Sequence, residues 1–311
     1  MMGSSYPSNN LPPDSGCNLF KDVTYLMHTA DLTLGNLEGT LLTGGVCTKK
    51  IEKGRCYAFR TPPDFVDNLV NAGFDYLNLA NNHMNDFGQG GITATMNTLK
   101  NAGLSYGGPH GSIGEFVVRG MNIAIVSFAT SPNAHTVFKI EEAQRIVAEH
   151  ARSHDITIVS FHGGGEGLKY LHTKDTFEYF MGWPRGNVVK FARAVIDSGA
   201  DLVWGHGPHV PRALELYKDR LIAYSLGNFC TWGFNLGDER GLAPILEVNM
   251  DTTGMFLSGR VHSAEQRTYT NLRVDTLHRA ARLIRRLSLE DFPQSTPSIS
   301  ENGLISVPEK E

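Results

Sequence analysis

Four clusters of histidine, asparagine and glutamate recur at one kind of position, directly after a short segment typical of a strand. The clusters are Asn36-Leu-Glu38, Asn81-Asn82-His83, His162-Gly-Gly-Gly-Glu166 and Gly205-His206-Gly-Pro-His209. The preceding segments, residues 31–34, 77–80, 158–161 and 202–204, are typical of strands. Because ligands bind outside the carboxyl ends of strands in open α/β sheets, we expect the four clusters to share one cleft.

These residue types suit divalent metal ions, since imidazole, carboxylate and amide oxygen are ligands for first-row ions such as Mn, Fe or Zn. The candidate donors are Glu38, Asn82, His83, His162, His206 and His209. Two ions about 3.5–4 Å apart clamp a phosphate ester and activate a water molecule. Each cluster alone also fits an ordinary turn or a hydrogen-bonded structural histidine. Their equivalent positions on successive strands favour a metal site.

Charged residues near these clusters are candidates for supporting roles. Asp86, three residues after His83, is spaced to accept a hydrogen bond from that imidazole, although a solvated loop carboxylate fits too. Arg212 and Arg185 are candidates for contact with an anionic substrate, because guanidinium pairs well with carboxylate or phosphate. A basic segment either steers a polycarboxylate or is a solvated loop, and its members are Lys49, Lys50, Lys53, Arg55 and Arg60.

The elements that position these residues alternate between helix and strand. Helices are predicted over residues 61–72, 91–102, 141–152, 187–197 and 273–287, and single strands over 75–80, 155–161 and 201–204. Hairpins are predicted over residues 116–129, 214–225 and 245–261. This pattern fits a layered α/β domain with mixed sheets. We predict a single domain over residues 1–311, with a polar tail at 294–311 that is compatible with a short strand at residues 304–307.

Composition narrows the class of protein. The chain has 311 residues and a net charge of −4, which argues against a dedicated nucleic-acid binder. It contains no run of 18 apolar residues of the kind that spans a membrane. Cys47 and Cys56 flank a short polar segment, so they form either a disulfide or two thiols.

Five motifs in order resemble a known family. They are Asn36-Leu-Glu38-Gly, Ala80-Asn-Asn-His83-x-x-Asp86-x-Gly88, His162-x-Gly-x-Glu166, Gly205-His-x-Pro-His209 and Tyr224-Ser-Leu-Gly-Asn228-Phe. Over residues 30–235 the chain is similar to the CapA family of poly-γ-glutamate capsule biosynthesis proteins. That family belongs with the calcineurin-like metallophosphoesterases, so the resemblance implies a four-layer α/β/β/α sandwich.

The resemblance also implies a role for each matching residue. His83 would be the catalytic imidazole. Independently of the resemblance, we expect Asp86 to act with His83 and Glu166 to lie with Arg185 and Arg212 at the substrate. The implied metal ligands are Glu38, which would bridge two ions, Asn82, His162, His206 and His209.

The start of the chain departs from the family pattern. The family begins with a strand that ends in a metal-binding Asp, whereas this chain begins Met1-Met2-Gly3-Ser4, which resembles the tail of that motif. We therefore expect the Asp and the first strand to lie upstream of residue 1, and the loss of this ligand to weaken the metal site or to empty one position.

The implied function is capsule or poly-γ-glutamate biosynthesis, with metal-assisted hydrolysis or transfer on an anionic polymer or a phosphoester. One alternative is a non-catalytic polymer-binding or assembly component that has lost its metals. Another is a cytosolic metallophosphoesterase unrelated to capsule. The implied partners are the anionic substrate and other capsule-synthesis membrane proteins, without nucleic acid. The implied location is extracytoplasmic or membrane-associated. Enzymatic activity, metal identity and oligomeric state are left open by the sequence.

Overall fold

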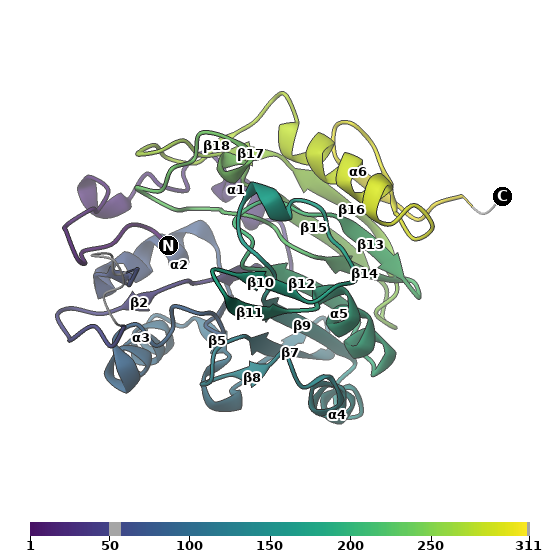
Figure 1. The fold of residues 1–311 in the computed structure, drawn as a ribbon, viewed down its shortest axis with the longest axis horizontal. Helices are drawn as coiled ribbons and strands as arrows, with labels where there is room; N and C mark the ends of the chain where they lie inside the picture. Colours follow the sequence, from purple (N-terminus) through teal and green to yellow (C-terminus); the bar gives the residue numbers. More distant parts are fainter. Residues whose placement is uncertain (50–56, 310–311) are drawn as a thin grey trace.

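The computed structural model describes residues 1–49 and 57–309, and its largest sheet has seven strands (Figure 1). In spatial order these are β13 (Leu214–Tyr217), β14 (Arg220–Ala223), β12 (Leu202–His206), β9 (Ile156–His162), β7 (Met121–Ala129) and β6 (Gly114–Val118), with β8 (His135–Thr136) also beside β7. The strands from β14 to β7 run parallel, whereas β13 and β6 are antiparallel to their neighbours. The predicted mixed sheet is therefore confirmed.

The other strands form smaller sheets. A parallel sheet contains β1 (Leu34–Asn36), β4 (Tyr76–Asn78) and β5 (Ser105–Gly107). An antiparallel sheet contains β15 (Ile245–Met250), β16 (Phe256–His262), β20 (Leu304–Ser306) and β19 (Ser298–Ile299). The two-stranded pairs are β2 (Thr40–Leu41) with β3 (Arg60–Thr61), β10 (Glu178–Phe180) with β11 (Trp183–Gly186), and β17 (Ala264–Glu265) with β18 (Arg273–Val274).

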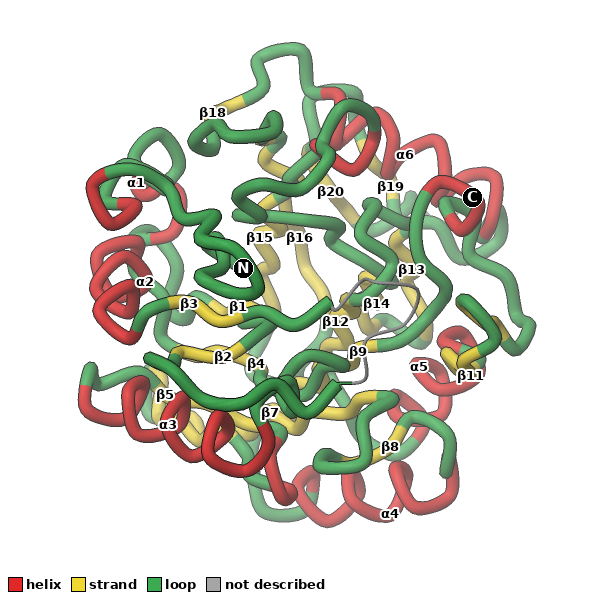
Figure 2. The backbone as a smooth tube through the Cα atoms, turned by 60° about the vertical axis from the view of Figure 1, so that its left-hand side comes forward, coloured by secondary structure: helices red, strands yellow, loops and turns green. Residues whose placement is uncertain are grey.

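The helices lie around the outside and the strands lie inside (Figure 2). They are α1 (Thr24–Met27), α2 (Val66–Ala72), α3 (Gly88–Asn101), α4 (Ile140–Ala151), α5 (Val188–Asp197) and α6 (Arg279–Asp291). Local signals explain their ends. The side chain of Asn187 accepts a hydrogen bond from the backbone N–H of Lys190 at the start of α5. Gly73 ends α2 with a φ of 92°, a left-handed conformation that glycine adopts without steric cost.

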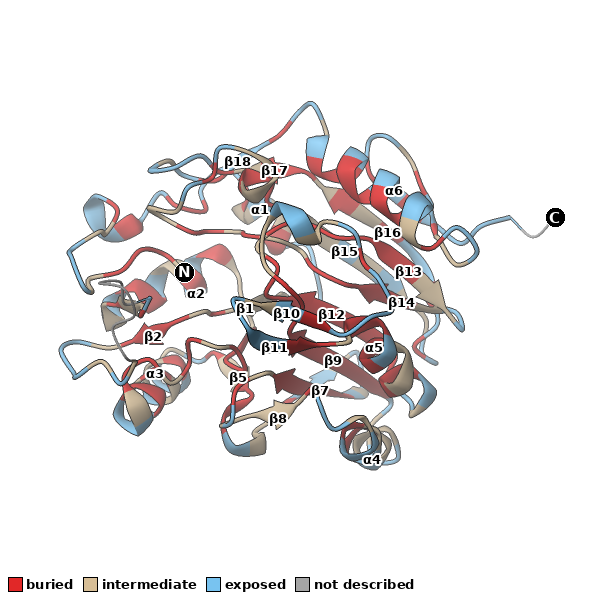
Figure 3. Cartoon of the chain, in the orientation of Figure 1, coloured by how far each residue is buried: buried red, intermediate tan, exposed pale blue. Residues whose placement is uncertain are grey.

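The two faces of the seven-stranded sheet are buried against different layers. On one face Val159 and Phe161 of β9 pack against α4 and α5. On the other face Ile158 packs with residues of β16 and β20. Figure 3 shows β9 and β12 buried along their length and α6 buried on one side only. The mixed α/β class is confirmed, with one face of the large sheet covered by helices and the other by a second sheet.

The carboxyl-terminal segment differs from the sequence prediction. The helix predicted over 273–287 begins at Arg279, because residues 273–274 pair as β18 instead. The polar tail expected at 294–311 contributes β19 and β20 to the four-stranded sheet. Ile299 in β19 and Ile305 in β20 are the buried residues of these two strands, at 6% and 2% exposure. β20 lies where the sequence indicated a short strand, at residues 304–307, whereas β19 was not predicted.

Candidate functional site

The carboxylate of Glu38 lies where three imidazoles from distant parts of the chain meet. Its Oε1 is 3.8 Å from His83 Nε2, 3.5 Å from His162 Nε2 and 3.9 Å from His209 Nε2. Glu38 follows β1, and the three histidines follow β4, end β9 and follow β12, respectively. The structure therefore brings residues from all four sequence clusters together at the carboxyl ends of strands.

His206 completes this group from the neighbouring strand. It ends β12 and pairs in register with His162 at the end of β9. Burial, together with the adjacent His162, lowers the pKa of His206 to about 3, while Glu38 opposes this shift. An imidazole with this pKa is neutral at pH 7 and keeps a lone pair, the form that binds metal ions.

The charge of Glu38 is set by the same neighbours. Burial would raise the pKa of its carboxyl, but the imidazoles of His209, His162 and His83 together lower it well below its usual value. Burial lowers the pKa of His162, and Glu38 opposes that shift. At neutral pH the group therefore has a carboxylate oxygen facing imidazole nitrogens, a donor set suited to a divalent cation.

Several buried polar atoms of the predicted metal ligands lack a hydrogen-bond partner among the described residues. They are Glu38 Oε1, Asn82 Oδ1, both ring nitrogens of His162, and His206 Nε2. Buried polar atoms without partners are uncommon in native proteins, so such a concentration calls for a ligand or ordered water. Asn82, whose amide oxygen was predicted to bind metal, thus belongs to the same set of unpaired atoms.

The donor distances are compatible with a shared ion. Two ligand atoms that are each about 2.1 Å from one ion lie at most about 4.2 Å apart. The separations of 3.5–3.9 Å from Glu38 Oε1 fall below this limit. Within residues 1–49 and 57–309, however, no three or more His, Cys, Asp or Glu side chains already have the geometry of a metal site. The donor types and unpaired atoms fit a divalent ion, and its binding would require the side chains to rearrange locally.

Asn228 fixes the orientation of His209. The side-chain NH₂ of Asn228 donates to the backbone oxygens of His209 and Arg240 at 3.1 and 3.0 Å. Its Oδ1 therefore faces His209 Nδ1, at 2.8 Å, and accepts a hydrogen bond from it. Nδ1 therefore carries a proton, and Nε2 is turned toward Glu38 Oε1 and toward Glu166 Oε2, which lie 3.9 and 4.0 Å away.

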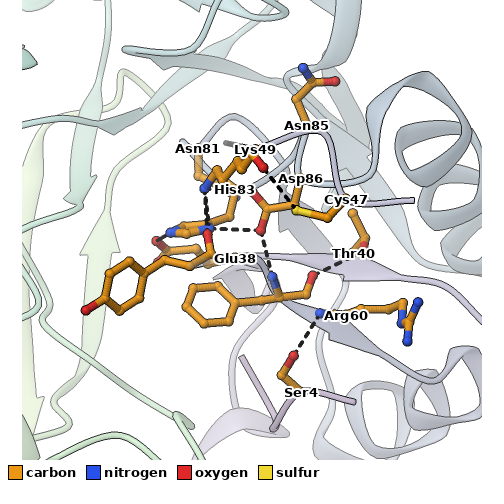
Figure 4. A network of polar contacts seen from close by, with 12 residues as sticks. Ser4, Glu38, Thr40, Cys47, Lys49, Arg60, Asn81, His83, Asn85 and Asp86 are labelled. Atoms are coloured by element: carbon orange, nitrogen blue, oxygen red, sulfur yellow. Dashed lines mark hydrogen bonds and ion pairs between the residues drawn. The ribbon is translucent and has the colours of Figure 1, made fainter. Parts of the chain in front are cut away.

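A carboxylate network holds His83 (Figure 4). Asp86 is fully buried, and its Oδ2 lies 2.9 Å from His83 Nδ1, as its spacing in the sequence predicted. The same oxygen accepts a hydrogen bond from the backbone N–H of Phe59 at 2.7 Å. Lys49 Nζ lies 2.7 Å from the other oxygen, Oδ1. Asp86 thus orients the ring and leaves Nε2 of His83 facing Glu38.

The two predicted substrate arginines differ in their positions. Arg212 is completely buried, and it donates to both oxygens of Glu178 at 3.1 and 2.9 Å and to the backbone oxygen of Gly165 at 3.1 Å. This position does not fit the substrate contact predicted for Arg212, because the guanidinium is enclosed and occupied. Arg185 pairs with Glu166, beside His209.

Of the two members of the basic segment that the structure describes, Lys49 and Arg60, Lys49 reaches the site. Lys50, Lys53 and Arg55 lie outside the described residues, as does Cys56 of the predicted Cys47–Cys56 pair. Arg60 instead stacks near the rings of Tyr6 and Phe87 and donates to Ser5 Oγ, so it fastens the N-terminal segment.

Sequence reasoning missed Glu178 and the position of Lys49. Glu178 is an isolated carboxylate within the aromatic segment Phe177–Phe180, and the alternation of that strand could have indicated that it points inward. Lys49 has no such signal, because it is 34 residues from His83 and meets it only in the folded chain.

Several known proteins are similar to this chain. Capsule biosynthesis protein CapA of Bacillus anthracis is 29% identical over 224 residues, which is 68% of this chain and 53% of that protein. PGA biosynthesis protein CapA of Bacillus subtilis (strain 168) is 29% identical over 229 residues, 68% of this chain and 56% of that protein. The chain therefore spans about half the length of these relatives.

A solved structure supports the fold. The crystal structure of a hypothetical protein from Thermus thermophilus superposes with a TM-score of 0.52 at 16% identity and covers 81% of this chain and 95% of that one. The family "Bacterial capsule synthesis protein PGA_cap" matches residues 1–231. This match includes Glu38 and all the histidines described above. By this match the chain belongs to the PGA_cap family of bacterial capsule synthesis proteins.

Proposed function

We propose that this chain acts in the synthesis of a bacterial capsule or poly-γ-glutamate through a metallophosphoesterase-type site centred on Glu38. The substrate class is an anionic polymer or a phosphoester, and the reaction is hydrolysis or transfer. The observation that carries the proposal is the buried Oε1 of Glu38, which has no hydrogen-bond partner among the described residues and lies within 3.9 Å of three imidazole nitrogens. We also propose that the fold is the four-layer α/β/β/α sandwich of metallophosphoesterases. The packing of the seven-stranded sheet against the four-stranded sheet supports this.

The residues that would hold divalent ions, Mn, Fe or Zn, are Glu38, Asn82, His162, His206 and His209. Such an ion, when bound, polarises the substrate oxygen and lowers the pKa of a bound water. Asn228 supports this assignment because its hydrogen bond with Nδ1 turns Nε2 of His209 toward Glu38, and Nε2 is the nitrogen that would bind an ion when the ring is neutral.

The remaining residues would orient the substrate and stabilise developing charge. His83 presents Nε2 toward Glu38 and would contact the leaving-group oxygen, with Asp86 holding the ring. Arg185 would counter the charge of an anionic substrate beside His209, although it is now paired with Glu166. Substrate entry would therefore compete with an existing ion pair.

We further propose a location at the cell envelope, extracytoplasmic or membrane-associated. It is supported by the capsule-related names of the relatives. Among the residues that the structure describes, no helix is both long enough and apolar enough to cross a bilayer. Other capsule-synthesis membrane proteins are the proposed partners.

Metal content and activity together test the proposal. The wild-type chain, loaded with Mn, Fe or Zn and desalted, is expected to retain metal and to hydrolyse bis(p-nitrophenyl) phosphate or a γ-glutamyl anilide. Glu38→Gln and His206→Ala should lose both properties. His172→Ala is the matched control, because His172 is exposed and pairs with Asp291. If the Glu38 and His206 variants keep wild-type metal content, the proposed site is wrong.

A second candidate is a polymer-binding or assembly component without metal ions. One observation favours it: Arg185 lies beside the histidines and already pairs with the carboxylate of Glu166, the kind of contact that an acidic polymer would make. Binding of poly-γ-glutamate by metal-free protein, undiminished in Glu38→Gln, would support this candidate over the metalloenzyme.

A further inference from the structure

Two phenylalanine rings lie against the imidazoles of the candidate site. The centroid of the Phe59 ring is 4.4 Å from that of the His83 ring. The centroid of the Phe234 ring is 5.5 Å from that of Phe59 and 6.1 Å from that of His209. The two phenylalanines therefore form a continuous aromatic surface that leads from one imidazole to the other, and we call this surface the aromatic wall.

The position of Phe59 in the wall is fixed by its backbone. Its N–H donates to Asp86 Oδ2 at 2.7 Å, and its carbonyl oxygen accepts from the N–H of Thr40 at 3.1 Å. The same Asp86 oxygen lies 2.9 Å from His83 Nδ1. One carboxylate thus holds both the backbone of Phe59 and the imidazole against which its ring lies.

Phe234 lies between two fastened residues of the loop that follows β14. On one side of it, the N–H of Thr231 donates to Gln266 Oε1 at 2.7 Å. On the other side, the N–H of Leu236 donates to Thr268 Oγ1 at 3.1 Å, and the side chain of Leu236 is buried. The loop is therefore held to one segment of the chain on both sides of Phe234, which keeps this ring beside the histidines.

The aromatic wall remains accessible to solvent next to polar side chains. Both of its residues are only partly buried, whereas a core ring such as Phe161 is fully enclosed. The side chains of His209 and Glu38 are 20% and 14% exposed. An apolar group that covers an aromatic ring removes both surfaces from water, which favours binding. An anion held at the polar side chains would therefore gain affinity by placing an organic substituent against the wall.

We propose that the aromatic wall is a specificity subsite that takes the organic substituent of the substrate beside His83. This inference rests on the proposed function and deepens it, because His83 would contact the leaving-group oxygen and the wall would receive the group attached to that oxygen. The favoured substrates are esters or amides whose leaving group has an apolar or planar face. Inorganic phosphate and small alkyl esters leave the wall uncovered. The competing role for the two rings is to shield the imidazoles from water.

Equilibrium binding of two inert anions tests the inference. Phenylphosphonate and methylphosphonate have the same head group, and only the phenyl ring is large enough to cover the wall. Titration of the full chain with each compound, followed by NMR or calorimetry, is expected to give a several-fold lower Kd for phenylphosphonate. Phe234→Ala should reduce this preference by about two- to tenfold, the range expected for one aromatic contact. Phe234→Tyr keeps a ring and should keep the preference.

Two further variants complete the experiment. Phe59→Leu keeps an apolar side chain but removes the second ring, and it should also reduce the preference. Tyr25→Ala removes a 60% exposed ring on α1 and should change neither Kd. Equal affinity for the two phosphonates in the wild type, no saturable binding of phenylphosphonate, or an unchanged ratio of the two Kd values in either folded wall variant would overturn the inference. Shielding alone predicts the unchanged ratio.

The ratio of the two Kd values also separates this inference from the proposed function. A site that holds no metal would bind both phosphonates more weakly through their common head group, which leaves the ratio as it is. An error about the wall changes the ratio, whatever the metal content of the chain. The metal content of Glu38→Gln therefore reports on the proposed site, and the ratio reports on the aromatic wall.

Discussion

Replacing Arg212 by methionine should destabilise the whole chain, because it would leave a carboxylate buried without its partner. Arg212 is fully buried and makes three hydrogen bonds of 2.9–3.1 Å, two of them to Glu178. Removing one partner of a buried ion pair typically costs about 3–5 kcal/mol. The same change would free the backbone oxygen of Gly165, next to the loop that follows His162.

This cost converts into a measurable shift of the melting temperature. Unfolding entropy near 60 °C is about 2.1 cal/mol/K per residue, so a chain of this length has about 0.65 kcal/mol/K. A loss of about 3–5 kcal/mol therefore lowers the melting temperature by about 5–8 °C. A Lys218→Met variant, which breaks an exposed pair, should change it by less than about 2 °C.

Scanning calorimetry of four proteins tests the reasoning: wild type, Arg212→Met, Glu178→Gln and the double variant. The double variant should be more stable than Arg212→Met, since it removes the unpaired charge while glutamine still accepts from the N–H of Gly165. If Arg212→Met melts within about 2 °C of wild type, or loses affinity for an anionic substrate without losing stability, the structural role assigned to Arg212 is refuted.

Two further predictions concern the core. Ile305 is buried in β20, so Ile305→Ala should lower the free energy of unfolding, measured in urea, by about 2–5 kcal/mol. Leu304→Ala, at the exposed neighbouring position, should lower it by less than about 1 kcal/mol. Equal losses in the two variants would contradict burial of the C-terminal segment. Burial raises the pKa of the Cys230 thiol to about 12, so native protein at pH 8 should show iodoacetamide labelling at Cys17 but not at Cys230 by mass spectrometry. In the unfolded chain this thiol ionises near its ordinary pKa, so the contribution of Cys230 to the free energy of unfolding should be complete below about pH 8.5 and decline as the pH rises toward 12. Rapid labelling of Cys230 in the native protein would contradict its burial.

The parts of the site that sequence predicted depend on short-range order. Recognising that His162 and His206 each follow an apolar strand was enough to place both at one edge of a sheet, and the structure shows that the two strands are parallel neighbours. Asp86 reaches His83 across three residues of one turn. Such relations follow from strand direction and local spacing, which are visible in the chain itself.

The parts that sequence did not predict depend on long-range partners. Arg212 was expected to face substrate because it follows the His206–His209 turn, but its partner Glu178 comes from a hairpin 34 residues earlier. Lys49 belongs to a basic segment whose composition suggested polymer steering, and only the fold reveals its contact with His83. Charge and spacing identified Arg212 and Lys49 as candidates for the site, whereas tertiary packing determined which partners their side chains contact.

The most direct measurement is anomalous X-ray diffraction from crystals of this chain soaked with Mn²⁺ and, separately, Zn²⁺. A site of the proposed kind should give an anomalous peak about 2.0–2.3 Å from Glu38 Oε1 and from Nε2 of at least two of His162, His206 and His209. At saturating metal, the lack of a peak within reach of Glu38, or a peak elsewhere with these side chains unmoved, would contradict the proposal that they form a metal centre.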